Sequence, residues 1–469
     1  MITPDITRIW PQGVSIFEGE EGMTDRGHSF EALAEKYGTP LYVIDTVDVA
    51  DRARYFVDTV RDSFANATTH VSFAGKAFLS KEIARIVAEQ GLFVDTCTWG
   101  EMQIALAAGI PGRRLVLHGN NKSDAEIRLA IEHDFDKIVI DEPQEPDRIA
   151  RIAREVGKRA RVMVRVTVGV HAGGHEYIST AHEDQKFGIA MLPAHHEDVT
   201  DVQSVLFFDE VAHGPAISVL QSVLHLSEDL ELVGVHSHIG SQIHDADAFI
   251  AAAERVMVLR RAFYATDGYV LPEIDLGGGY SVAYTEGDAS MDIEATMKRI
   301  AQAVHSDSAR AGLPLPIVSF EPGRWIVAPA GYTLYRVGTV KNVPLEGGQS
   351  RVYVSVDGGM SDNIRPALYG AEYTAVVANR ATTGETVQAR VVGSHCESGD
   401  VVVHDIQLPA DIQRGDLLAV PVTGAYGRTM ASNYNQILRP AVVAVDENGS
   451  HVMMRRETME DLLELDVSE

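Results

Sequence analysis

Cysteine is scarce in this sequence, with 2 residues in a chain of 469. Cys97 and Cys396 are too few for a disulfide framework, so we expect the reducing cytoplasm as the compartment. No apolar run reaches the roughly eighteen residues that a membrane helix needs. The first residues also lack the basic-then-apolar order of a signal peptide. We therefore expect a cytoplasmic protein without a membrane span or a membrane partner.

Positively charged residues are also fewer than negatively charged ones. The 40 Lys and Arg residues face 67 Asp and Glu residues, which gives a formal net charge of −27 at pH 7. This balance argues against nucleic-acid and anionic-membrane partners, and no basic patch interrupts it. An anionic ligand must then be attracted by a few local cations. The hydrophobic content of 45% is that of a globular chain, long enough for a large core and two domains.

The sequence does contain a series of short apolar runs that are typical of buried strands. Eight of them precede Glu321: Val71–Ala74, Phe93–Cys97, Arg114–His118, Lys137–Asp141, Arg161–Val166, Leu232–His238, Glu273–Leu276 and Ile317–Phe320. Helical patterns fill most of the gaps, so the runs predict an α/β fold, an eight-stranded parallel barrel of the TIM type. The active site of such a barrel lies at the carboxyl ends of its strands.

After Arg324 the pattern changes to short β-branched segments separated by Gly, Asp or Asn turns. This pattern predicts an antiparallel β domain. Its expected strands are Thr333–Val340, Arg351–Val356, Thr374–Val377, Thr386–Val392, Leu417–Val422, Ala441–Val445 and His451–Met454. A final helix is expected from about Glu457 to Leu465.

Glycines and cations stand where several of the predicted barrel strands end. Gly277-Gly278-Gly279 follow the seventh strand and Gly323-Arg324 follow the eighth. Barrels commonly bind phosphate at these two loops, because glycine lets backbone N–H groups approach an anion. Ser241, after the sixth strand, could add a hydroxyl. Lys76 ends the first strand, where its amine could form a Schiff base with an aldehyde cofactor.

In these motifs the chain resembles the diaminopimelate decarboxylases, pyridoxal-phosphate enzymes of the alanine-racemase-like fold type III, from about Phe30 to the C-terminus. The segments that carry the resemblance are Ser72-Phe-Ala-Gly-Lys-Ala77, His118-Gly-Asn-Asn-Lys122, Lys186-Phe-Gly188, His236-Ser-His-Ile-Gly-Ser-Gln242, Glu321-Pro-Gly-Arg324, Asp357-Gly-Gly-Met-Ser-Asp-Asn-Ile-Arg-Pro-Ala-Leu-Tyr369, Cys396-Glu-Ser-Gly-Asp400 and Ala425-Tyr426 with Met430-Ala-Ser-Asn-Tyr434. The resemblance implies pyridoxal 5'-phosphate as the cofactor. It also implies a cofactor-binding barrel over residues 46–330 and a β domain from residues 1–45 and 331–469, which Leu41–Ile44 would join.

The resemblance assigns roles around the cofactor. Glu321 would lie at the ring nitrogen and His238 would stack on the ring, which leaves His236 a structural role. The expected cofactor-binding residues are Lys76, His238, Ser241, Gly278, Gly279, Glu321, Gly323, Arg324 and Tyr426. Cys396 would protonate the carbanion after carbon dioxide leaves, which requires a protonated thiol. Cys97 is expected to be a small buried hydrophobe.

The resemblance implies that meso-2,6-diaminopimelate is converted to L-lysine and carbon dioxide, the last step of lysine biosynthesis. This substrate has an amino-acid head at each end, so its distal head needs cations for a carboxylate and an anion for an ammonium. Arg324, Arg365 and Tyr369 would bind the carboxylate, Glu397 would bind the ammonium, and Tyr426 would also face the substrate. The Cys396 segment would reach the barrel of a second subunit, which implies a homodimer with shared active sites.

Other functions stay open at this point. Ornithine, arginine, lysine and carboxynorspermidine decarboxylases share the fold type, and a racemase or a non-catalytic homologue that binds pyridoxal phosphate would share much of the pattern. Lys76 and Cys396 argue against the non-catalytic homologue. Arg324, Arg365 and Glu397 together favour diaminopimelate over the simple diamine precursors.

One stretch, Met191–Ser227, is longer than is usual in the family. It contains His195-His196-Glu197-Asp198, a combination that could bind a metal ion. Exposed polar clusters are usually solvated loops, so we expect no metal site there.

Overall fold

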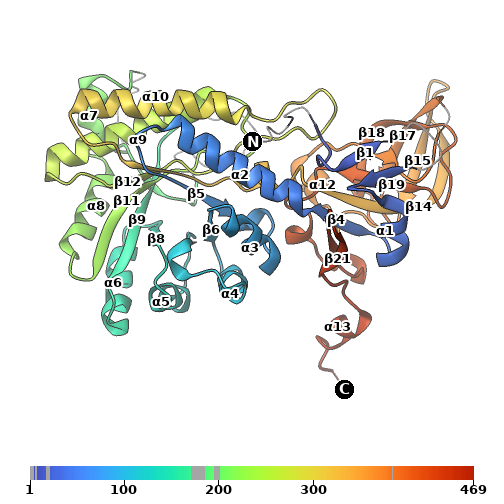
Figure 1. Cartoon of the computed structure of the whole chain (residues 1–469), viewed down its shortest axis with the longest axis horizontal. Helices are drawn as coiled ribbons and strands as arrows, with labels where there is room; N and C mark the ends of the chain where they lie inside the picture. The colour runs from blue at the N-terminus through green and yellow to red at the C-terminus, as the bar shows by residue number, and fades with distance from the viewer. Residues whose placement is uncertain are drawn as a thin grey trace. The chain divides into compact units, whose positions relative to one another are not determined.

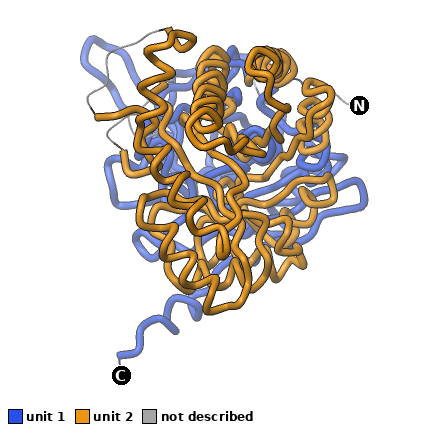
Figure 2. Tube along the Cα trace, turned by 90° about the vertical axis from the view of Figure 1, so that its left-hand side faces the viewer, with its two compact units in different colours: residues 1–52, 282–290, 324–469 blue, residues 53–281, 291–323 orange. Residues whose placement is uncertain are grey.

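The computed structural model describes residues 5, 8–16, 22–170, 185–194, 201–382 and 384–468. These residues form two compact units (Figure 2). The barrel unit consists of Ala53–Ser281 and Met291–Gly323, and the β unit consists of Met1–Arg52, Val282–Ser290 and Arg324–Glu469. The His195-His196-Glu197-Asp198 cluster lies outside the described residues.

The barrel unit is built on a closed sheet of eight parallel strands (Figure 1). They are β5 (Thr69–Ala74), β6 (Phe93–Thr96), β7 (Leu115–Leu117), β8 (Lys137–Ile140), β9 (Ala160–Thr167), β11 (Leu230–His236), β12 (Glu273–Asp275) and β13 (Ile317–Phe320). Each strand pairs in parallel with the next, and β13 pairs with β5 to close the ring. All eight predicted strands are confirmed. The short strand β10 (Ile189–Ala190) adds to β9.

Helices lie around the outside of the barrel strands (Figure 1). They are α2 (Thr46–Ser63), α3 (Lys81–Glu89), α4 (Trp99–Ala107), α5 (Asp124–Glu132), α6 (Glu145–Val156), α7 (Val205–Ala212), α8 (Pro215–His225), α9 (Ala246–Asp267) and α10 (Ile293–Ala311). Helix α3 illustrates why these segments are helical. Ile83 and Val87, one turn apart, are buried, and the Ser80 hydroxyl caps the first turn by accepting from the N–H of Ile83. The strands β7 and β8 are buried along their whole length, which explains why every residue except Lys137 is apolar.

The β unit is a sheet in which most neighbours are antiparallel. Its strands lie in the order β18 (Val401–Pro409), β17 (Thr386–Val392), β15 (Ser350–Val356), β14 (Gly331–Pro344), β4 (Leu41–Asp45), β20 (Ala441–Asp446) and β21 (Gly449–Met454). In addition, β19 (Leu417–Pro421) pairs with β14 and with β16 (Val376–Val377). The pairs β15–β17 and β4–β20 are parallel. As predicted, the segment that begins at Leu41 joins the C-terminal strands.

Shorter elements complete the β unit. They are β1 (Val14–Ile16), β2 (Met23–Asp25), β3 (His28–Ser29), α1 (Phe30–Tyr37), α11 (Arg324–Val327), α12 (Arg365–Tyr369) and α13 (Met459–Leu463). Strand β18 is the one long strand that the sequence did not predict, because His404 and Asp405 are exposed in its middle and interrupt the apolar pattern. Within the described part of the chain, none of the helices has the length and hydropathy of a membrane span.

Candidate active site

Lys76 stands at the carboxyl end of β5, in the single 3-10 turn Gly75–Ala77. Its side chain is exposed, whereas both neighbours in the turn are buried. The positive charge of Lys76 reaches His238, whose pKa it helps to lower after the larger effect of burial. Lys76 and His238 therefore lie at the same end of the barrel, as the sequence predicted.

The glycine loop after β12 is packed against two neighbouring strand ends. A Cβ atom on Gly278 would lie 2.2 Å from the carbonyl oxygen of Glu321, and one on Gly279 would lie 2.3 Å from that of Gly240. Gly279 also has a φ of +112°, which favours glycine. The N–H of Gly278 donates to Nδ1 of His238 over 3.2 Å. Larger side chains are excluded here, so the loop presents bare backbone of the kind that binds phosphate.

His238 is half-buried and accepts that hydrogen bond as a neutral imidazole. Burial lowers the pKa of His238 well below its ordinary value, and the charges of Lys76 and Arg165 add to the effect. To accept from the N–H of Gly278, Nδ1 must carry no proton, and a neutral imidazole ring meets this requirement.

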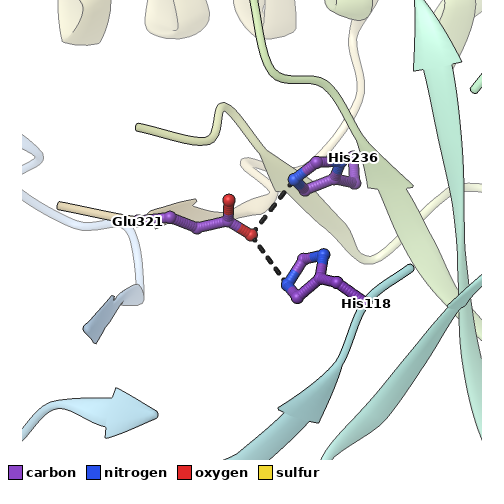
Figure 3. Close-up of side chains that lie close together, drawn as sticks. All are labelled: His118, His236 and Glu321. Carbon is purple, nitrogen blue, oxygen red and sulfur yellow. Dashed lines mark ion pairs between the residues drawn. The ribbon is translucent and has the colours of Figure 1, made fainter. Parts of the chain in front are cut away.

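Glu321 lies between two histidines beyond the end of β13 (Figure 3). Its Oε1 atom is 3.1 Å from Nε2 of His118 and 3.1 Å from Nε2 of His236. Burial opposes charge on His118, but the carboxylates of Glu321 and Asp95 raise its pKa to about 10. Burial lowers the pKa of His236 to about 4. The two histidines outweigh the effect of burial on Glu321 and hold its pKa well below the ordinary value.

Two further buried carboxyl groups lie in this region. Asp95 Oδ1 is 3.7 Å from Nε2 of His118, and burial raises the pKa of Asp95 to about 6. Asp275 accepts from the N–H of Gly277 over 2.9 Å, and burial followed by the charge of Glu321 raises its pKa well above the ordinary value. Glu321 is therefore the one of these three carboxyl groups whose pKa the surroundings lower.

His118, His236 and Glu321 also have the donor types of a metal site, and their donor atoms lie within 4.8 Å of one another. The group is better suited to hold one ionised carboxylate against an organic cofactor, in the way that a carboxylate favours a protonated pyridine nitrogen.

In the β unit, two arginines and three tyrosines form a compact cluster. Arg324 and Arg365 are 9% and 6% exposed. Nη1 of Arg324 donates to the hydroxyl of Tyr284, and Nη1 of Arg365 donates to that of Tyr373. The ring of Tyr426 lies 4.6 Å from Cζ of Arg324. Among the described residues, no carboxylate lies within 4.0 Å of the Arg365 guanidinium.

The loop between β17 and β18 carries Cys396 and Glu397, and both are exposed. The N–H of Cys396 donates to Oδ1 of Asn435 over 3.0 Å. Glu397 accepts from the N–H of Gly399 over 3.2 Å, and this hydrogen bond is the main reason that its pKa is lowered. His395, whose Nδ1 lies 2.8 Å from Oδ2 of the buried Asp400, anchors the start of the loop.

The structure thus distributes the expected site residues over both units. The barrel unit holds Lys76, His238, Ser241, Gly278, Gly279, Glu321 and Gly323, and the β unit holds Arg324, Arg365, Tyr369, Cys396, Glu397 and Tyr426. Ser241 is half-buried in the loop after β11, and Tyr369 ends α12 four residues after Arg365.

Sequence reasoning missed several residues of the site. His118 belongs to a segment that carried the resemblance but received no role, and the contact between the His236 ring and Glu321 was not predicted. Asp95, Tyr284 and Tyr373 had no signal in the sequence, because nothing in their local pattern marks them apart from other strand or loop residues.

Comparison with known proteins places these observations in a family. Residues 53–206 and 211–328 match the family model "Pyridoxal-dependent decarboxylase, pyridoxal binding domain". The chain is 43% identical to a diaminopimelate decarboxylase of Corynebacterium efficiens, over 98% of this chain and 94% of the relative. It is 44% identical to one of Mycobacterium tuberculosis, over 98% of each. The crystal structure of the M. jannaschii diaminopimelate decarboxylase with L-lysine matches with a TM-score of 0.84 at 30% identity, over 98% of each chain.

Proposed function

This chain belongs to the pyridoxal-dependent decarboxylases, and from that premise we propose that it releases carbon dioxide from the D-configured end of meso-2,6-diaminopimelate to yield L-lysine. The reaction would be the last step of lysine biosynthesis. The observation that carries the choice of substrate is the buried pair Arg324 and Arg365, two cations that suit a second carboxylate. The relatives that cover nearly the whole chain are diaminopimelate decarboxylases, which supports the same choice.

Pyridoxal 5'-phosphate supplies the electron sink for this chemistry when it is bound. The residues of the barrel unit fit this cofactor. Lys76 offers an exposed amine for the aldehyde, and the backbone at Gly278 and Gly279 can receive the phosphate, with Ser241 and Gly323 beside the same strand ends. Glu321, kept ionised by His118, would hold a proton on the ring nitrogen, and the neutral ring of His238 would pack against the cofactor.

Arg324 and Arg365 would bind the carboxylate of the distal head, with Tyr369 and Tyr426 contributing to the same end of the site. Glu397 would bind the distal ammonium, since its carboxylate is ionised and exposed. A planar guanidinium can donate two parallel hydrogen bonds to one carboxylate, so the pair would orient the substrate as well as attract it. Simple diamine precursors lack this second carboxylate.

Cys396 would deliver the proton from its Sγ atom to the carbon that loses carbon dioxide. Its exposed position on the β17–β18 loop suits a contact with a second copy of the chain. The active unit would be a homodimer, in which the cofactor domain over residues 46–330 of one subunit meets the domain of residues 1–45 and 331–469 of the other. We place this enzyme in the cytoplasm.

The test is a decarboxylation assay of the purified protein with pyridoxal phosphate and the separate stereoisomers of diaminopimelate. Carbon dioxide and L-lysine should form in equal amounts from the meso isomer. Lys76→Ala should stay folded, lose the visible absorbance of the lysine-bound cofactor, and lose activity. Exposed Lys81→Ala, at the start of α3, is the matched control and should retain both. Turnover of ornithine or lysine that matches that of diaminopimelate would reassign the enzyme to a related decarboxylase.

A further inference from the structure

Tyr284 contacts both arginines of the cluster in the β unit. Its hydroxyl accepts from Nη1 of Arg324, and its ring centroid lies 4.7 Å from Cζ of Arg365 and 5.9 Å from Cζ of Arg324. Tyr284 is 7% exposed. The buried phenol of Tyr284 therefore contacts both guanidiniums, that of Arg324 mainly through its oxygen and that of Arg365 through its ring face.

Tyr373 supports this arrangement from a second direction. Its ring meets that of Tyr284 edge-on, with a centroid distance of 5.3 Å and an interplanar angle of 79°. Its hydroxyl accepts from Nη1 of Arg365, and its ring lies 5.6 Å from Cζ of that residue. The two guanidiniums carry like charges that repel each other, and the two rings and two phenol oxygens offset that repulsion.

The two phenols differ in acidity. Burial raises the pKa of Tyr284, but the charges of Arg324 and Arg365 outweigh it, so the pKa is lower than usual. Burial also raises the pKa of Tyr373. The charge of Arg365 lowers it by less than burial raises it, so the pKa of Tyr373 stays above its ordinary value. The side chain of Tyr284 faces Arg324 on α11, Arg365 on α12 and Tyr373 after α12, and the ring of Tyr426 contacts Arg324. The exposed Asp288 accepts from the backbone N–H of Tyr284 over 3.4 Å. The charged groups that contact the phenol ring and hydroxyl are thus the two arginines.

We infer that Tyr284 is a positioning residue for substrate selection, which holds Arg324 and Arg365 as a pair for the distal carboxylate of the substrate. The inference rests on the proposed function, because the carboxylate is that of diaminopimelate. A bound carboxylate neutralises the guanidiniums, so the pKa of Tyr284 rises when it binds. By reciprocity, ionisation of Tyr284 at high pH weakens binding of the carboxylate.

The kinetic test is Tyr284→Phe, which keeps the ring and removes the hydroxyl. The KM for meso-diaminopimelate should rise about tenfold, as expected for one charged hydrogen bond, while kcat stays within about twofold. In the wild type KM should increase with pH as Tyr284 ionises, and in the variant this increase should disappear. Tyr264→Phe, an exposed position on α9, is the control and should behave as the wild type.

The spectroscopic test uses the holoenzyme and the ultraviolet absorbance of tyrosinate. The chain has 15 tyrosines, so the wild-type titration minus that of Tyr284→Phe isolates one of them. Pimelate, which carries the two carboxylates without amino groups, should move the midpoint of this difference titration to higher pH. Cadaverine, which has no carboxylate, should leave it in place. Tyr373→Phe should retain the titration, because it keeps Tyr284 and both arginines.

The outcomes separate this inference from the proposed function. If the wild type converts meso-diaminopimelate but Tyr284→Phe has an unchanged KM, or pimelate leaves the midpoint in place, the inference is wrong and the proposed function stands. If the wild type yields no lysine while pimelate still raises the midpoint, the proposed function is wrong and Tyr284 still belongs to a carboxylate site.

Discussion

His118 and Glu321 form a buried ion pair in the barrel unit, with Nε2 of the histidine 3.1 Å from Oε1 of the glutamate. Burial alone would neutralise both groups. Instead, attraction to Glu321 and Asp95 outweighs burial and raises the pKa of His118 to about 10, while His236 and His118 hold the pKa of Glu321 well below its ordinary value. His118 is thus the charged partner that keeps the carboxylate at the proposed ring-nitrogen position ionised.

His118→Asn should raise the pKa of Glu321, because burial then acts against the carboxylate with less opposition. The acidic limb of the kcat profile should move to higher pH, and the dissociation constant of pyridoxal phosphate should rise by about an order of magnitude. Both can be measured, by pH-dependent kinetics and by cofactor titration of the apoenzyme. His225→Asn, at an exposed position in α8, should change neither. An acidic limb that stays in place would show that His118 does not control Glu321.

Arg365→Ala should impair the use of meso-diaminopimelate mainly through binding. The loss of charged hydrogen bonds should cost about 2 kcal/mol or more in kcat/KM, which corresponds to about 30-fold. Arg351→Ala is the control, since Arg351 pairs with the exposed Asp405 on the strand surface and should leave kcat/KM unchanged.

The wild type should discriminate against lysine and ornithine by roughly four orders of magnitude in kcat/KM, because a site built for a carboxylate rejects analogues that lack it.

Mixing two inactive variants tests whether the active site is shared between subunits. If each site takes Lys76 from one chain and Cys396 from the other, Lys76→Ala and Cys396→Ala should each be nearly inactive as homodimers. A heterodimer has one site with both lesions and one with neither, so random reassociation should restore about a quarter of wild-type activity. The activity should appear at the rate of subunit exchange, followed by pull-down of a tagged chain. If fully exchanged mixtures gain no activity, Cys396 acts in the barrel of its own chain and the site is not shared.

A charged pair inside the barrel, Lys137 on β8 and Glu273 on β12, should govern stability at acid pH. Glu273 contacts Nζ of Lys137, and although burial raises its pKa, the charge of Lys137 and the hydrogen bonds from Lys137 and Ser319 help to lower it to about 2. The stabilisation is complete above the ordinary pKa of about 4.5 and is lost as the pH falls from there toward 2. Glu273→Gln should lower the free energy of unfolding near neutral pH by about 3 kcal/mol, because the buried Lys137 loses its nearer carboxylate and retains Asp136 at 3.3 Å.

Urea titrations at several pH values can measure this difference. The gap between the wild type and Glu273→Gln should narrow as the pH falls from about 4.5 toward 2, where the wild-type carboxylate is also protonated. Glu294→Gln removes half of the exposed pair with Lys298 and is the matched control, expected to remain close to the wild type at every pH. A gap that does not depend on pH would mean that Glu273 acts by packing alone.

Much of the fold could be predicted from the sequence because its signals are local. A strand buried on both faces is mostly apolar, so eight largely apolar runs identified eight barrel strands. The positions of Lys76, Gly278, Gly279 and Glu321 just after such runs also predicted the end of the barrel at which the candidate site lies. Strand β18 escaped prediction because its exposed middle, with His404 and Asp405, carries no apolar pattern.

Which side chains meet was decided by the tertiary structure. His118, His236 and Glu321 follow or end three different strands, and only closure of the barrel brings their rings and carboxylate together, where burial and mutual charge set their pKa values. Tyr284 and Tyr373 likewise come from separate loops and meet Arg324 and Arg365 only in the folded chain. A local sequence pattern records the burial and conformation of one segment, whereas ion pairs and ring contacts depend on distances between segments that the fold alone sets.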